Sequence, residues 1–100
     1  MPEEGAPLSM TVDVDGVLVL EGEIDAHSSA ALARHLHDKR AINVLDLSAV
    51  SFIDSSGLRV LVEAHQTRER DGGLVLRSPS AAVQRLLEIS GLAGHLDVSG

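Results

Sequence analysis

The sequence contains no cysteine, no tryptophan and no tyrosine, and it has a single phenylalanine. The absence of cysteine excludes disulfide scaffolds, thiol catalysis, iron–sulfur clusters and cysteine-type zinc sites. The scarcity of aromatic side chains argues against the stacking platforms that bind nucleic-acid bases. A chain of 100 residues has room for one compact domain with an aliphatic core, which excludes multidomain enzymes, barrels and long repeat arrays.

Positive charge is also scarce. The chain has fifteen acidic residues and eight lysines and arginines, which gives a formal net charge of −7. Such a surface repels phosphate backbones and anionic lipids. No apolar run approaches the roughly 18 residues of a membrane span, and the N-terminus lacks the basic and apolar regions of a signal peptide. We therefore expect a soluble cytoplasmic protein that binds neither nucleic acid nor membranes directly.

The chain is expected to form one α/β domain, with an α+β mixed sheet, from residue 10 to residue 100 after a flexible leader at residues 1–9. Strand-like apolar runs alternate with amphipathic helical segments in the order β-β-α-β-α-β-α-β. Strands separated by helices imply parallel crossovers, and an N-terminal hairpin adds an antiparallel pair. The helices are expected to pack on the sheet.

The hairpin is predicted at Asp15-Gly16, which stands between two β-rich runs. Both central residues of a type I′ turn need positive φ, so this dipeptide predicts a two-residue loop. In that register Val12 faces Val19, and Val14 faces Val17. The second strand is apolar on both faces, so it is expected to lie deeper in the sheet than the first.

Caps and apolar periodicity predict three helices. Asp25 is the expected N-cap of a helix that reaches about Arg40, with Leu32 and Leu36 as its firmest core positions. The second helix follows Asp54. The third is expected to start at Ser78-Pro79 and to close at Gly91 in a left-handed cap. The other predicted strands span residues 42–47, 74–76 and 95–98.

Sequence motifs for catalysis are missing. The chain has no nucleophile elbow, no dinucleotide fingerprint, no phosphate loop and no H-E-x-x-H zinc motif. We interpret four of the five histidines as structural: His27, His35, His37 and His95. The fifth, His65, continues the apolar stripe of the second predicted helix and is interpreted as a half-buried packing residue. We therefore expect no enzyme activity, no metal site and no cofactor.

A small hydrolase remains a conceivable alternative, because Ser55, His65 and Asp25 could be written as a triad. Nothing in their spacing supports it, and Ile53 stands where a nucleophile elbow has its glycine. Nucleotide binding by the domain itself is the other small-molecule alternative, and it lacks a phosphate loop.

The segment from Ser51 to Leu58 is chemically unusual, because two hydroxyls and a carboxylate stand where a strand gives way to a helix. One interpretation is capping, since Asp54, Ser55 or Ser56 can each accept a hydrogen bond from an unpaired backbone N–H. The other is phosphorylation. A serine at a helix N-terminus is accessible, and its phosphate would sit at the positive end of the helix dipole. The two interpretations do not exclude each other.

Four segments together resemble STAS domains, and in particular bacterial anti-sigma factor antagonists. They agree with the family in order and spacing over about residues 10 to 98, and the resemblance implies a mixed sheet flanked by helices. The segments are Val44–Leu58 with its Asp-Ser-Ser-Gly, Gly22-Glu-Ile-Asp25, Asp71-Gly-Gly-Leu-Val-Leu76 and Ser80–Leu92.

The resemblance implies partner switching. The unmodified antagonist binds an anti-sigma factor that is itself a serine kinase, and this frees the sigma factor. The kinase then phosphorylates the serine after the motif aspartate, which ends the complex, and a serine phosphatase resets it. By this resemblance Ser55 is the phosphorylation site and Asp25 lies near it. Further phosphosite or partner-binding positions are implied at Asp54, Ser56, Gly57 and Leu58.

A different role within the family is the main alternative. The same fold serves as an accessory subunit of membrane transporters and as a scaffold in stress-sensing assemblies. The intact Asp-Ser-Ser-Gly and the absence of a fused sensor or transporter segment favour the antagonist.

Overall fold

The computed structural model describes residues 7–99, so positions 1–6 of the predicted leader and position 100 lie outside the described residues. Within this range the chain forms a sheet and three helices joined by short turns. The strands are β1 (Ser9–Val12), β2 (Leu18–Ile24), β3 (Val44–Ile53), β4 (Val75–Arg77) and β5 (Asp97–Ser99), the helices are α1 (Ala26–Asp38), α2 (Ser55–Thr67) and α3 (Ala81–Ser90), and the 3-10 turns are η1 (Glu69–Asp71) and η2 (Ala93–His95).

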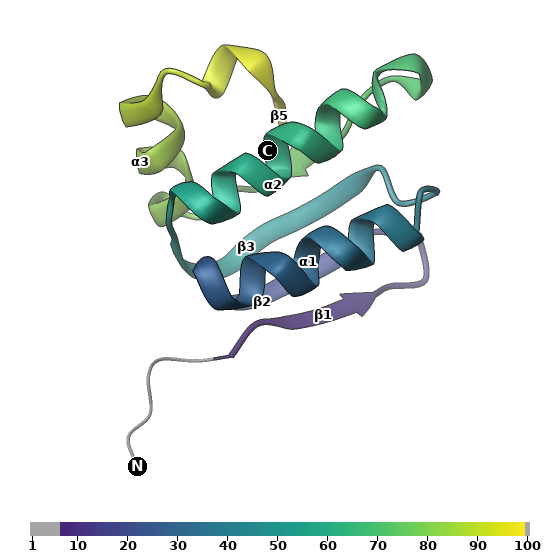
Figure 1. Cartoon of the computed structure of the whole chain (residues 1–100), viewed down its shortest axis with the longest axis horizontal. Coiled ribbons are helices and arrows are strands. Elements are labelled where there is room, and N and C mark those ends of the chain that lie inside the picture. Colours follow the sequence, from purple (N-terminus) through teal and green to yellow (C-terminus); the bar gives the residue numbers. More distant parts are fainter. Residues whose placement is uncertain (1–6, 100) are drawn as a thin grey trace.

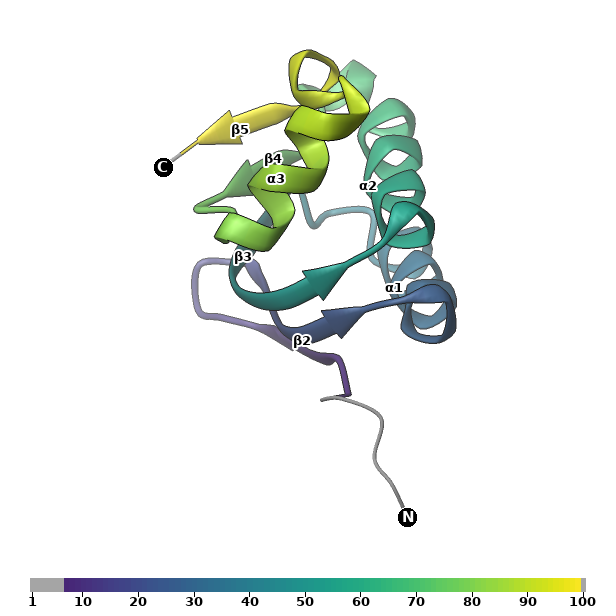
Figure 2. The same cartoon turned by 90° about the vertical axis from the view of Figure 1, so that its left-hand side faces the viewer.

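The sheet has the strand order β1-β2-β3-β4-β5. β1 pairs with β2 antiparallel, and every later pair is parallel. The predicted order of elements and the mixed α/β class are thus confirmed. Helices α1 and α2 lie side by side across one face of the sheet, and α3 lies toward the end at which β3 gives way to α2 (Figures 1 and 2).

Aliphatic side chains fill the space between the sheet and the helices. Leu18, Leu20 and Leu45 of the central strands have no exposed surface, and the expected core residues Leu32 and Leu36 of α1 are 0% and 1% exposed. Burying one such side chain is worth about 1.5–3 kcal/mol relative to leaving it exposed. The sheet and helices are therefore held together by an aliphatic core, and Phe52 lies outside it.

The hairpin register differs from the prediction by one residue. Val12 pairs with Leu18 rather than with Val19, and Val14 is fully exposed in the loop rather than opposite Val17. The amide of Gly16 donates to the carbonyl of Asp13 at 3.1 Å, and Gly16 has a φ of 81°. The loop therefore has three residues, a type I turn followed by a left-handed glycine, instead of the two of a type I′ turn.

Other boundaries also moved. α1 ends at Asp38, two residues before the predicted end, and β3 runs to Ile53 instead of Leu47. The third helix is capped by Ser80, whose hydroxyl accepts from the amide of Val83 at 3.4 Å. Ser78 is not the cap, because it has a φ of 51° and its amide bonds to the carbonyl of Ser99. Among residues 7–99, no helix is both long and apolar enough to cross a membrane.

Candidate functional site

The site is built where β2 and β3 end side by side. These strands run parallel, and their last residues, Ile24 and Ile53, are partners in the sheet. The next residues along each strand are Asp25 and Asp54, and the amide of Asp54 donates to the carbonyl of Ile24 at 3.2 Å. Since neighbouring strands lie about 4.8 Å apart, the sheet places the two aspartates, and the helices that follow them, next to each other.

Asp54 caps α2. Its Oδ1 accepts hydrogen bonds from the amides of Ser56 at 2.9 Å and Gly57 at 3.1 Å. Of the three candidates for the cap, the carboxylate therefore fills the role. Ser55 is the first residue of α2 and is exposed, and no hydrogen bond among the described residues uses its hydroxyl group. Ser55 is thus an accessible hydroxyl that the fold does not use.

Asp25 caps α1 in the same way. Its Oδ1 accepts from the amides of His27 at 3.0 Å and Ser28 at 2.9 Å, and from the Ser28 hydroxyl at 3.1 Å. The backbone hydrogen bond from Ser28 is the largest of the effects that hold the pKa of Asp25 below its ordinary value. The carboxylate is therefore stabilised in its charged form, close to the start of α2.

Gly57 and Leu58 anchor the start of α2. A Cβ at position 57 would lie 2.5 Å from Cγ2 of Ile24 and 3.1 Å from its carbonyl oxygen, so only glycine fits between α2 and β2. The Leu58 side chain is 4% exposed and belongs to the core. The Leu58 side chain therefore holds the start of α2 against the core.

A shallow groove with a volume of about 450 Å³ opens between the N-terminal halves of α1 and α2. One guanidinium and several hydroxyls line it, together with small apolar side chains. Arg59 is the only charged side chain among its lining residues. The lining consists of Ser29, Ala30, Ala33, Ser55, Ser56, Arg59 and Val60.

Residues 8–99 match the family profile described as "STAS domain". The chain belongs to the STAS family. The resemblance seen in the sequence is thus confirmed. The "Anti-sigma-B factor antagonist" of Listeria monocytogenes is 34% identical to this STAS domain over 92 residues, which cover 86% of this chain and 81% of the relative.

Solved structures agree with this membership. An anti-sigma factor antagonist from Mycobacterium paratuberculosis superposes with a TM-score of 0.76 at 28% identity, over 92% of this STAS domain and 85% of that chain. The Bacillus cell fate determinant SpoIIAA in its phosphorylated form superposes with a TM-score of 0.65 at 20% identity, over 93% of this chain and 91% of that chain. At 20% identity, the likeness to SpoIIAA shows a shared fold.

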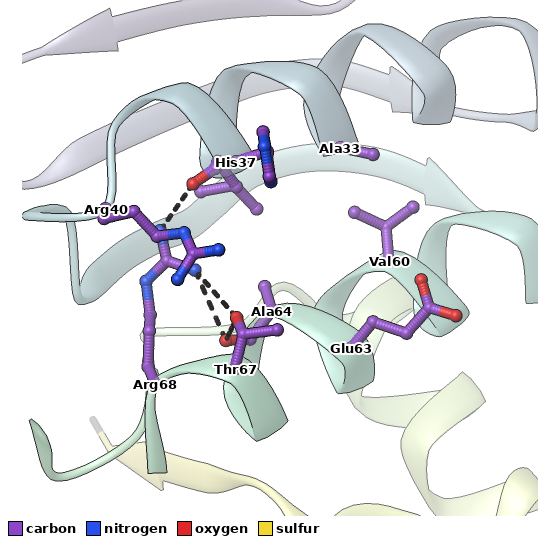
Figure 3. A pocket seen from close by; sticks show the side chains of 9 residues that line it. Ala33, His37, Arg40, Val60, Glu63, Ala64, Thr67 and Arg68 are labelled. Atoms are coloured by element: carbon purple, nitrogen blue, oxygen red, sulfur yellow. Dashed lines mark hydrogen bonds between the residues drawn. The ribbon is translucent and has the colours of Figure 1, made fainter. Parts of the chain in front are cut away.

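A second cavity of about 240 Å³ lies farther along the α1–α2 junction of the STAS domain (Figure 3). It shares Ala33 and Val60 with the groove beside Ser55. Its walls are mainly apolar, and Arg40 and Arg68 lie at the end opposite Glu63 in the picture. The hollow between the two helices therefore continues from Ser55 toward their C-terminal ends.

Arg68 is a buried cation that the sequence did not reveal. Its side chain is only 3% exposed, and its partners are oxygens without formal charge. Nε donates to Ile42 O at 2.6 Å, and Nη2 to Leu36 O at 2.7 Å and Lys39 O at 3.1 Å. Desolvation, and then the nearby charge of Arg40, lower the pKa of Arg68 from its ordinary value. Its guanidinium therefore joins the end of α1 to the end of α2.

The histidines form no metal cluster in the described part of the STAS domain. His65 is half-buried, as predicted. Its Nδ1 accepts from the amide of Leu74 at 2.9 Å, and a Cβ on Gly73 would collide with the ring. His65 therefore supports the turn that leads into β4, and it lies apart from Asp25 and Ser55 in the fold.

Proposed function

We propose that this STAS domain is an anti-sigma factor antagonist switched at Ser55. In its unphosphorylated form it binds an anti-sigma factor serine kinase and so releases the sigma factor. Phosphorylation of Ser55 ends the complex, and a serine phosphatase restores the binding form. The observation that carries the proposal is the exposed Ser55 hydroxyl at the first position of α2, while the neighbouring Asp54 does the capping.

The chemistry of the transfer belongs to the kinase. The Ser55 Oγ attacks the γ-phosphorus of ATP, a new O–P bond forms, and the bond to the departing ADP breaks. A base on the kinase takes the hydroxyl proton, and Mg²⁺ on the kinase neutralises the phosphate charge. This chain supplies the acceptor, held at a fixed place by the capped start of α2. It acts as a substrate and binding protein.

The phosphate acts on the partner more than on the fold. It adds a charge of about −1.5 to −2 at neutral pH. At the start of α2 the helix dipole offsets about 0.3–1 kcal/mol of the repulsion from neighbouring carboxylates. Against a docked partner the same charge would lose water without gaining a counter-charge, which costs about 2–5 kcal/mol. Since 1.4 kcal/mol is a factor of ten in affinity, this is enough to dissociate a moderate complex.

The comparisons support this function. The curated relative is named as an antagonist, and a protein of the same fold has been solved in a phosphorylated form. The electrostatics also support it, because an acidic chain with a net charge of −7 attracts a basic protein surface and repels nucleic acid and anionic lipid.

The experiment is incubation with candidate anti-sigma factor kinases and ATP, followed by mapping of the phosphate by mass spectrometry. We expect one phosphate on Ser55 of the native protein and of Ser56→Ala, and none on Ser55→Ala. In pull-downs with ATP present, Ser55→Ala should stay bound and Ser55→Asp should bind weakly. A phosphate on Ser56 would overturn the assignment of the site. Recovery of a transporter subunit in place of a kinase would favour the alternative role.

A further inference from the structure

Ser55 and Arg59 lie one helical turn apart on the same side of α2. Positions i and i+4 of a helix are neighbours on its surface, and both side chains line the groove between α1 and α2. Both residues are exposed. Among residues 7–99 the one ion pair joins Arg77 to Asp46, so Arg59 is not committed to a carboxylate of the described chain.

We propose that Arg59 is the intramolecular ligand of the phosphate on Ser55, and that the groove beside it is the seat of the phosphorylated side chain. This inference rests on the proposed phosphorylation of Ser55. Guanidinium is the side chain best suited to bind a phosphate, because its planar fork donates two parallel hydrogen bonds to two oxygens. A phosphate at i and an arginine at i+4 meet without rearrangement of the helix.

The charged groups around Ser55 favour Arg59 as the partner of the phosphate. Asp54 and Asp25, at the caps of α2 and α1, repel a phosphate at position 55. His27 contributes positive charge when protonated, and it follows Asp25 in the first turn of α1. Glu63 lies one turn after Arg59 on α2 and competes for its guanidinium. The second charge of the phosphate gives it the advantage over that single carboxylate.

The consequence for the switch is a reversal of charge in the groove. Before modification, Arg59 is the groove's only charged lining residue and is open to a carboxylate of a docking partner. After modification, a phosphate of about −1.5 to −2 engages that guanidinium and leaves the groove negative. Phosphorylation of Ser55 therefore adds a negative charge that repels the partner's carboxylate and also occupies the guanidinium of Arg59 that would attract it.

The test is made on protein that carries phosphoserine at position 55 by genetic encoding, without any kinase. ³¹P NMR titration measures the second pKa of the phosphate in the Arg59 protein, in Arg59→Gln and in Arg59→Lys. Arg85→Gln, which removes an exposed arginine of α3, is the matched control for net charge. We expect the pKa to rise by about 0.3 in Arg59→Gln, less in Arg59→Lys, and not at all in Arg85→Gln.

A second readout keeps the result specific. The Nε–H signal of Arg59 should shift and exchange more slowly in the phosphorylated protein, because a hydrogen-bonded guanidinium proton is protected. Equal phosphate pKa values in the Arg59 protein and Arg59→Gln, with an unmoved Arg59 signal, would overturn the proposal. The encoded phosphoserine separates this result from the proposed function: absence of phosphorylation by any kinase would sink that function and leave the Arg59 contact measurable.

Discussion

The amide of Asp54 donates a hydrogen bond of 3.2 Å to the carbonyl of Ile24. This bond ties the end of β3 to the end of β2, at the residue from which α2 begins. Asp54 in turn holds the first amides of α2. The position of Ser55 therefore follows from the register of the two central strands. A substitution that disturbs this junction should displace the proposed phosphosite before other parts of the fold.

Gly57→Ala tests the packing of that junction. The new methyl group would collide with Ile24 on its side chain and on its carbonyl, so α2 must shift away from β2. We expect a loss of about 1–3 kcal/mol in the free energy of unfolding, as for other overpacked core sites, measured by urea denaturation. Gly94→Ala is the control, because a Cβ there meets no atom within 4 Å. A loss of the same size in Gly94→Ala would contradict the steric explanation.

Asp25→Asn tests the capping carboxylate through pH. The folded state lowers the pKa of Asp25, so its charged form contributes stability above the ordinary aspartate pKa of about 3.9. That contribution is lost as the pH falls through the folded pKa. The gap in urea midpoint between the native protein and Asp25→Asn should therefore be widest near neutral pH and should close in acid. A gap of the same size at neutral pH and in acid would contradict this linkage.

The same Asp25→Asn variant tests the role of the carboxylate in kinase contact. The side-chain oxygen of asparagine can still accept hydrogen bonds from the first amides of α1, so the circular dichroism spectrum should remain native despite the lower stability. We expect phosphorylation of Ser55 by the cognate kinase to slow, because the negative charge beside the phosphosite is gone. Loss of the native spectrum would instead show that Asp25 acts only as a structural cap.

The parts of the site that the sequence predicted are those with local causes. Asp25 precedes a helical pattern and accepts from amides two and three residues ahead, so the cap is readable from neighbours alone. Gly91 is likewise a local feature, and it closes α3 with a φ of 76° as expected. The alternation of strands and helices then fixes which strand ends meet.

The parts that the sequence did not predict depend on contacts distant along the chain. The observed hairpin register pairs Met10 with Leu20 and Val12 with Leu18. Leu18 and Leu20 are fully buried, and this tertiary packing overrides the preference of Asp-Gly for a tighter loop. In the sequence, Arg68 is indistinguishable from any other polar residue that follows a helix. Its function emerges only when carbonyls 26 and 32 residues away converge on it.

Arg68→Met tests this long-range cap. The substitution keeps most of the buried volume but leaves the carbonyls of Leu36 and Ile42 without a donor, and each unpaired buried group costs about 1–3 kcal/mol. We expect a loss of about 2–4 kcal/mol in the free energy of unfolding, measured by urea denaturation. Arg70→Met, two residues later and exposed, is the matched control and should change little.

Arg68→Lys separates charge from geometry in the same experiment. Lysine retains the positive charge, but its single ammonium cannot reach carbonyls that the guanidinium contacts through Nε and Nη2. If the fork is what joins the two helix ends, Arg68→Lys should recover only a small part of the stability lost in Arg68→Met. Full recovery would mean that a point charge near the helix C-termini is sufficient, and that the individual hydrogen bonds of Arg68 contribute little.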